Sequence, residues 1–138
     1  MTRRALLLAA FAVAAFADAE SDVWDLFTRM ASALSNGNAR EFLSAVDPAA
    51  PGYEALRANV NALVQQADVQ SSIEVVENTG DTSKRNVEMD WLLVITDRQD
   101  TANIARRRER VKCRVEKSGK KWRIVSLEPV KLFAPPRP

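Results

Sequence analysis

The sequence predicts an α+β domain in which three N-terminal helices pack on one face of a four-stranded antiparallel sheet. Apolar residues recur with the helical period of 3.6 up to about residue 68 and with the strand period of 2 beyond it. Helical and strand segments are therefore separated along the chain rather than alternating, which is the pattern of α+β proteins. One face of such a sheet needs cover, and three amphipathic helices can supply it.

The first 19 residues are predicted to be a secretory signal peptide. Arg3 and Arg4 are positive, residues 5–16 form an apolar run, and residues 17–19 read Ala-Asp-Ala, an A-x-A cleavage site. The run is too short to cross a membrane, which takes about 20 residues. We therefore expect a bacterial protein exported to the periplasm or the medium, with no transmembrane segment in the mature chain, a single domain over 20–133 and a proline-rich tail over 134–138.

Three helices are expected in the first half of this domain. The first is expected to begin at Ser21 and to end at Asn36-Gly37, because both residues tolerate the left-handed conformation of a helix end. Asn38 with Glu41 three residues later is the pattern of a capping box for a short second helix. Pro51 is placed to open the third. The apolar stripes of the three helices are formed by Val23, Phe27, Met30 and Leu34, then by Phe42, Leu43 and Val46, then by Tyr53, Leu56, Val60 and Leu63.

Four antiparallel strands are expected after residue 68, separated by polar turns near 78–81, 98–101 and 118–120. The second strand shows the clearest alternation, since every second residue from Val87 to Ile95 is apolar. The fourth is expected to span Lys121 to Val130. The apolar side of the third and fourth strands is formed by Val111, Cys113, Val115, Trp122 and Ile124.

The residue types present exclude several kinds of chemistry. The chain contains no histidine, so histidine-based metal sites and catalytic triads are ruled out within it. It contains one cysteine, Cys113, so a disulfide framework is ruled out as well. Cys113 falls on the inward face of its strand and lacks an activating base, so we expect a buried, unreactive thiol. No metal, cofactor or catalytic residue is assigned.

The order of elements resembles the nuclear-transport-factor-2-like superfamily, also called cystatin-like. ALSNGNAREFLSAVDP is similar to the family's helix, polar turn and short helix ending at Asp-Pro. GKKWRIVSLE resembles its final strand, in which a tryptophan follows a Gly-Lys turn. The resemblance covers most of the mature chain and implies that the helices lie in the concave side of a curved sheet. Its members include isomerases, dehydratases, hydrolases and non-catalytic binding domains.

The chain departs from the family between the second and third helices. Many members place a small pair of strands there, often helping to close the mouth of the pocket, and residues 47–53 leave no room for one. This departure argues against a deep, lidded, enzyme-like cavity. The pocket candidates are Tyr53, Trp91, Arg107, Glu109 and Trp122. Each has a plainer interpretation, since tryptophans at amphipathic spacing are commonly core and the charged pair near a hairpin turn can be solvated.

Charge is segregated along the chain. Residues 20–105 include 14 acidic and 6 basic side chains, whereas residues 106–138 include 12 basic and 3 acidic. Five of the cations recur at every second residue of the third strand and are expected to point outward; this basic strip is formed by Arg106, Arg108, Arg110, Lys112 and Arg114. Glu88 and Asp90 are expected opposite its far end, which leaves Arg106 and Arg108 unpaired beside Leu92 and Val94.

Three interpretations of the basic strip stay open: a solvated face with ion pairs, a homodimer interface on the convex face of the sheet, and a surface that binds anionic envelope polymers. Nucleic acid is not expected, because the chain is predicted to be exported and no aromatic residue interleaves with these cations. The sequence favours a non-catalytic binding or assembly module, with a small apolar ligand as one partner. The alternative is an isomerase or dehydratase using Tyr53 and Glu109 in the cone pocket.

Overall fold

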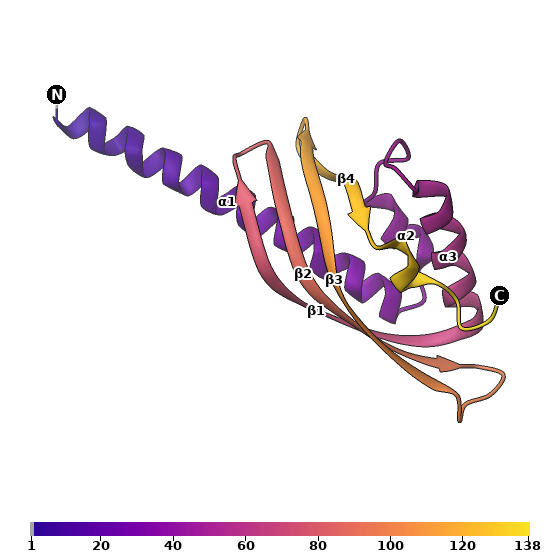
Figure 1. Cartoon of the computed structure of the whole chain (residues 1–138). Coiled ribbons are helices and arrows are strands. Elements are labelled where there is room, and N and C mark those ends of the chain that lie inside the picture. Colours follow the sequence, from indigo (N-terminus) through magenta and orange to yellow (C-terminus); the bar gives the residue numbers. More distant parts are fainter. Residues whose placement is uncertain (1) are drawn as a thin grey trace.

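The computed structural model describes residues 2–138, with the surroundings of side chains from residue 15 onward. It confirms the predicted class. Three helices lie against the concave side of a curved, unclosed sheet whose four antiparallel strands follow sequence order (Figure 1). The elements in order are α1 (Thr2–Ser35), α2 (Ala39–Ser44), α3 (Tyr53–Gln66), β1 (Ala67–Gly80), β2 (Lys84–Asp97), β3 (Ile104–Ser118), β4 (Lys121–Glu128) and the 3-10 turn η1 (Val130–Phe133).

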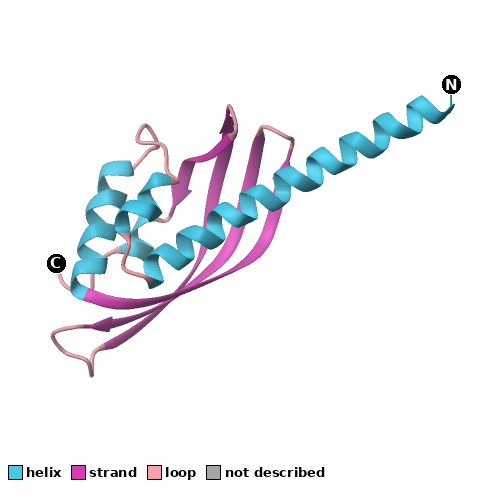
Figure 2. Cartoon of the chain, turned by 180° about the vertical axis from the view of Figure 1, so that it is seen from behind, coloured by secondary structure: helices cyan, strands magenta, loops and turns pink. Residues whose placement is uncertain are grey.

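Helix α1 begins earlier than predicted. Instead of starting at Ser21, it runs without a break from Thr2. The run 5–16 is rich in alanine and leucine, which have high helix propensity, so nothing in it stops the helix. Within the described side chains the buried core begins at Ala19, and the earlier turns of α1 project beyond the sheet (Figure 2). No helix among the described residues has the length and hydropathy that a membrane span requires.

Helix α2 forms where its capping box places it, whereas α3 begins at Tyr53, so Pro51 lies before the N-cap Gly52 and not in the first turn as predicted. The capping box is present, because the Asn38 side chain accepts a hydrogen bond from the Glu41 backbone N–H at 3.0 Å and donates to the Glu41 carboxylate at 3.2 Å. Helix α3 follows Gly52, whose φ of +76° suits glycine. The link from α2 to α3 consists of turns and one isolated bridge, from Val46 to Ile124 of β4, so the strand pair common in the resembled family is absent from this described segment.

The register of the sheet confirms the predicted alternation. Glu88 lies opposite Lys112 and Asp90 opposite Arg110, so all four side chains point away from the helices. The inward side chains of β2 from residue 87 to 95 are each exposed by 2% or less. Because strand side chains alternate, a one-residue slip would place this entire row in water, which fixes the register.

Candidate functional site

The centre of the concave face is filled by side chains. The rings of Phe42, Trp91 and Phe133 contact one another, with centroids 5.2 Å apart for the two pairs that include Phe133 and 6.3 Å apart for the third. All three residues are fully buried. The Trp91 indole N–H donates to the Ser71 hydroxyl at 2.8 Å, which satisfies its one polar atom. The pocket candidate Trp91 is therefore part of a packed aromatic core.

The other pocket candidates do not converge on one cavity. Tyr53 is half-buried at the start of α3, and Glu109 is exposed. Trp122 is buried and its indole N–H lacks a partner in the described structure. It lines an open hollow of about 840 Å³ between α1, α2 and the β3–β4 turn, and none of the other four candidates lines that hollow.

Arg107 is half-buried on the inner face of β3, where its partner is the chain's own C-terminal segment. Its Nη1 donates to the Leu132 carbonyl at 2.9 Å and to the Ala134 carbonyl at 2.6 Å. Burial lowers the pKa of the guanidinium from its ordinary value. Among the described residues it makes no ion pair with Glu109, although both lie on the same face. The two residues therefore do not form the carboxylate–guanidinium pair considered from the sequence.

Residues that the sequence analysis did not single out complete this end of the cone. Arg137 in the tail lies 3.1 Å from Asp97 of β2, measured from Nε to Oδ2, as an ion pair rather than an aligned hydrogen bond. Asp97 is only 2% exposed. Leu132 and Phe133 are also buried, so the segment after β4 belongs to the core. In the sequence, the adjacent apolar residues Leu132 and Phe133 before the proline-rich tail were the one sign that this segment is buried.

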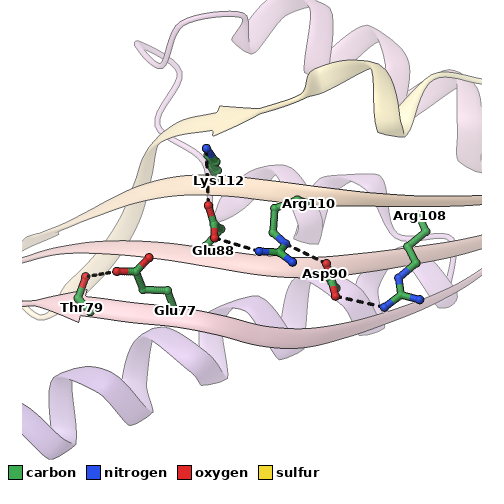
Figure 3. Close-up of polar contacts among 7 residues, drawn as sticks. All are labelled: Glu77, Thr79, Glu88, Asp90, Arg108, Arg110 and Lys112. Atoms are coloured by element: carbon green, nitrogen blue, oxygen red, sulfur yellow. Dashed lines mark hydrogen bonds and ion pairs between the residues drawn. The ribbon is translucent and has the colours of Figure 1, made fainter.

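Three residues of the basic strip, Arg108, Arg110 and Lys112, lie on the convex face, away from α1, and pair with two acidic residues (Figure 3). The Asp90 carboxylate accepts hydrogen bonds from Arg110 at 3.0 Å and from Arg108 at 3.2 Å. Glu88 pairs with Arg110 at 3.2 Å and with Lys112 at 3.6 Å. These contacts lower the pKa of the Asp90 carboxyl, with the Arg110 hydrogen bond as the largest cause and that of Arg108 next, and they raise that of Arg110.

One expectation about the basic strip was wrong. Arg108 was expected to be unpaired, but it reaches diagonally to Asp90 although Leu92 is its direct neighbour across the strands. Diagonal neighbours on a sheet face lie about 7–8 Å apart at the backbone, a gap that a long arginine side chain spans. Arg106 and Arg114, at the two ends of the basic strip, make no ion pair within the described residues.

Cys113 is 3% exposed between the valines at 111 and 115. Burial, with a smaller contribution from the charge of Glu128, raises the pKa of its thiol far above the ordinary value. The thiolate is therefore disfavoured, and the geometry supplies no reactive nucleophile at this position. Within the described residues, no group of acidic or cysteine side chains is placed to hold a metal ion.

Comparisons with known proteins identify the fold. No family model matches the chain, and no curated protein matches it. Among solved structures, a conserved protein from Planctomyces limnophilus aligns with a TM-score of 0.71 and 13% identity, over 78% of this chain and 91% of that one. A nuclear-transport-factor-2-like superfamily protein from Salmonella enterica aligns with a TM-score of 0.64 and 11% identity, over 80% and 89%. A ketosteroid isomerase-like protein from Erwinia carotovora aligns with a TM-score of 0.64 and 9% identity, over 78% and 92%. These likenesses establish the fold and leave the activity open.

Proposed function

We propose that this chain, a domain with the nuclear-transport-factor-2-like fold, is a non-catalytic assembly module that pairs with a second copy of itself through the convex face of its sheet. The observation that carries the proposal is the contrast between the two faces. The concave face is filled by its own aromatic core, whereas the convex face carries acidic and basic columns side by side.

The columns are complementary under a two-fold rotation. Four outward acidic side chains lie on β1 and β2, the five cations of the basic strip lie on β3, and Glu128 of β4 lies opposite Lys112 on the same face. An axis parallel to the strands, midway between β2 and β3, places β3 of one copy over β2 of the other. Each basic strip then faces the partner's acidic column. On β2, the strand that the basic strip faces, that column is formed by Glu88 and Asp90.

Charged side chains without an ion pair, together with partly exposed apolar surface, support the same arrangement. Arg106 and Arg114, at the two ends of the basic strip, make no ion pair within the described residues, so their charges are not neutralised inside the chain. Leu92 and Val94 supply aliphatic surface beside the proposed axis and are half-buried. Thirteen residue pairs join β2 to β3. With strands about 4.8 Å apart and about 3.4 Å per residue, β2 and β3 offer roughly 400 Å² per copy, and the outward faces of β1 and β4 would supply the rest of the roughly 800 Å² per partner of a standard interface.

The enzyme alternative has less support from the geometry. An isomerase or dehydratase needs an acid or base positioned against a substrate in the cone. Among the described residues, neither Tyr53 nor Glu109 lines any of the three main hollows of the surface, and the aromatic core fills the centre of the cone. A solvated face with ion pairs predicts a monomer, so the oligomeric state separates this alternative from the proposal.

We also propose that the module acts outside the cytoplasm of a bacterium, because residues 1–19 have the organisation of a signal peptide. In that setting, self-association through charge would be set by the ionic strength of the periplasm or medium.

The experiment is sedimentation equilibrium of the protein and of two matched variants. Leu92→Lys places a cation on the proposed interface, opposite the partner's cations, whereas Val76→Lys places one at the exposed bulge of the edge strand β1. We expect a dimer for the parent and for Val76→Lys, and a monomer for Leu92→Lys. A monomeric parent would refute the proposal. Loss of the dimer in Val76→Lys alone would move the interface to the sheet edge.

A further inference from the structure

The predicted cleavage site of the leader lies inside helix α1 rather than in a loop. Residues 17–20 belong to the unbroken helix Thr2–Ser35. Ala19 is 5% exposed and belongs to the hydrophobic core. The Asn78 side chain of β1 donates a hydrogen bond to the Glu20 carbonyl at 3.2 Å. Proteases cut folded proteins mostly at exposed, flexible segments, so the bond between Ala19 and Glu20 is poorly placed for cleavage in the folded chain.

The helix also separates the two alanines that define the site. The A-x-A motif has small residues two positions apart. Side chains with this spacing point to the same side of an extended chain. In a helix they lie about 200° apart, since each residue turns the chain by about 100°. The structure shows the consequence, because Ala17 is exposed while Ala19 is buried. A peptidase that reads both alanines on one side can do so only after this turn of α1 unwinds.

Unwinding this turn disturbs the packing of α1 on the sheet. A carbonyl in a helix accepts a hydrogen bond from the N–H group four residues later, so freeing residues 17–20 releases the turn over 21–24. Within that turn Val23 is fully buried and Trp24 is half-buried. Helix α1 packs against β1 (Figure 2), and Trp24 lines a groove with Ile73 of that strand. Exposing the bond therefore means lifting the first turn of the mature helix from β1.

We propose that the fold protects the bond between Ala19 and Glu20, so that the leader is removed before α1 docks on β1. This order of events rests on the proposed export and is independent of pairing through the convex face. The chain crosses the membrane unfolded and is cut by a signal peptidase while residues 17–20 are still extended. A precursor that folds first keeps its leader.

Two arginines near the N-terminus make the proposal specific to one export route. Arg3-Arg4 follows Thr2, and a twin arginine is the mark of leaders that direct already folded proteins across bacterial membranes. A chain exported in that way would offer the peptidase a bond inside a finished helix. The burial of Ala19 favours the other general route, in which the chain is threaded through the membrane unfolded.

The test compares two full-length precursors, each with residues 1–138, treated with purified bacterial signal peptidase. One is the folded parent. The other is Leu93→Asp, which places a carboxylate in the buried row of β2 and keeps the chain unfolded, as circular dichroism would report. We expect the folded parent to be cut at least about tenfold more slowly, because cleavage of a protected bond follows the fraction of molecules that are locally open. The mass of the product should correspond to a chain that begins at Glu20.

A second pair of variants separates local opening from general destabilisation. Val23→Ala loosens the turn that must open and leaves residues 17–20 unchanged, so it should raise the cleavage rate of the folded precursor about fivefold or more. Val64→Ala is the matched control, because it makes the same truncation at a partly buried position of α3. It should be cut at the rate of the parent. If Val23→Ala does not fold, it serves as a second unfolded precursor beside Leu93→Asp.

The export route is tested in cells with Arg3→Lys and Arg4→Lys combined, which keeps both charges and removes the arginine pair. Export and the mass of the exported chain should not change. Loss of export would overturn the proposal, because the chain would then cross the membrane folded. Equal cleavage of the folded parent and of Leu93→Asp would also overturn it, while leaving the proposed export intact. Cleavage of neither precursor would refute the signal peptide itself, and the protected bond with it.

Discussion

Replacing Phe42 by alanine tests whether the cone is filled as the structure shows. Phe42 is fully buried, and its ring contacts Trp91 and Phe133. Truncation of a buried phenylalanine costs about 3–5 kcal/mol, because the transfer free energy of the ring is lost and a cavity is left behind. At about 4 °C per kcal/mol for a domain of this size, the melting temperature should fall by about 12–20 °C. Phe42→Leu keeps most of the volume and should cost about 1 kcal/mol.

Urea unfolding followed by tryptophan fluorescence measures the loss directly, provided that the slope of the transition is unchanged. Ile104→Ala is the matched surface control, because Ile104 is 55% exposed, and its change should stay within about 0.5 kcal/mol. A cost below about 1 kcal/mol for Phe42→Ala, in a protein that still folds, would show that the ring lines open space. The cone would then hold the open space that an enzyme pocket needs.

Three further predictions follow from single residues. Burial raises the pKa of Cys113 in the folded state, so the folded chain keeps a thiol proton that the unfolded chain loses above about pH 8.5. The free energy of unfolding should therefore decline as pH rises beyond that value, less steeply in Cys113→Ala; identical slopes would contradict the buried thiol. Gly80→Ala should lower the melting temperature far more than Gly119→Ala, because a Cβ at Gly80 would collide with the Lys84 carbonyl, whereas a Cβ at Gly119 would meet no atom within 4 Å. Equal effects of the two changes would be inconsistent with this β1–β2 turn. The intact mass of the exported protein should correspond to a chain that begins at Glu20, and retention of residues 1–19 would rule out the signal peptide.

The sequence was sufficient for the order of elements and for the two faces of the sheet. The change of period near residue 68 marks the boundary between α3 and β1, which the structure places at Gln66 and Ala67. Alternation on β2 predicted Glu88 opposite Lys112 or Arg114 and Asp90 opposite Arg110 or Lys112, and the structure has Lys112 and Arg110 at these places. Both predictions rest on the period of apolar residues along one element. Burial of a single face sets this period, so it can be read from the sequence without knowing the tertiary contacts.

The remaining features depend on contacts between distant segments. The diagonal reach of Arg108 to Asp90 requires knowing the side-chain conformation as well as the register. The role of the C-terminal segment depends on Arg107 meeting carbonyls 25 and 27 residues away, which periodicity does not encode. The start of helix α1 at Thr2 follows from local helix propensity. The predicted start at Ser21 treated residues 1–19 as a cleaved signal peptide and therefore left them out of the helix.

The most direct test of the assembly proposal is a charge-reversal complementation on the convex face. One variant carries Glu88→Lys and Asp90→Lys, so that its face is basic; the other carries Arg108→Glu and Arg110→Glu, so that its basic strip is broken. Native mass spectrometry at low ionic strength, where charges interact over about 10 Å or more, would report the mass of each variant and of their mixture. The proposed axis predicts that each variant is weakened as a homodimer and that the mixture forms a heterodimer. Homodimers of undiminished strength, or a mixture that stays monomeric, would contradict pairing through this face.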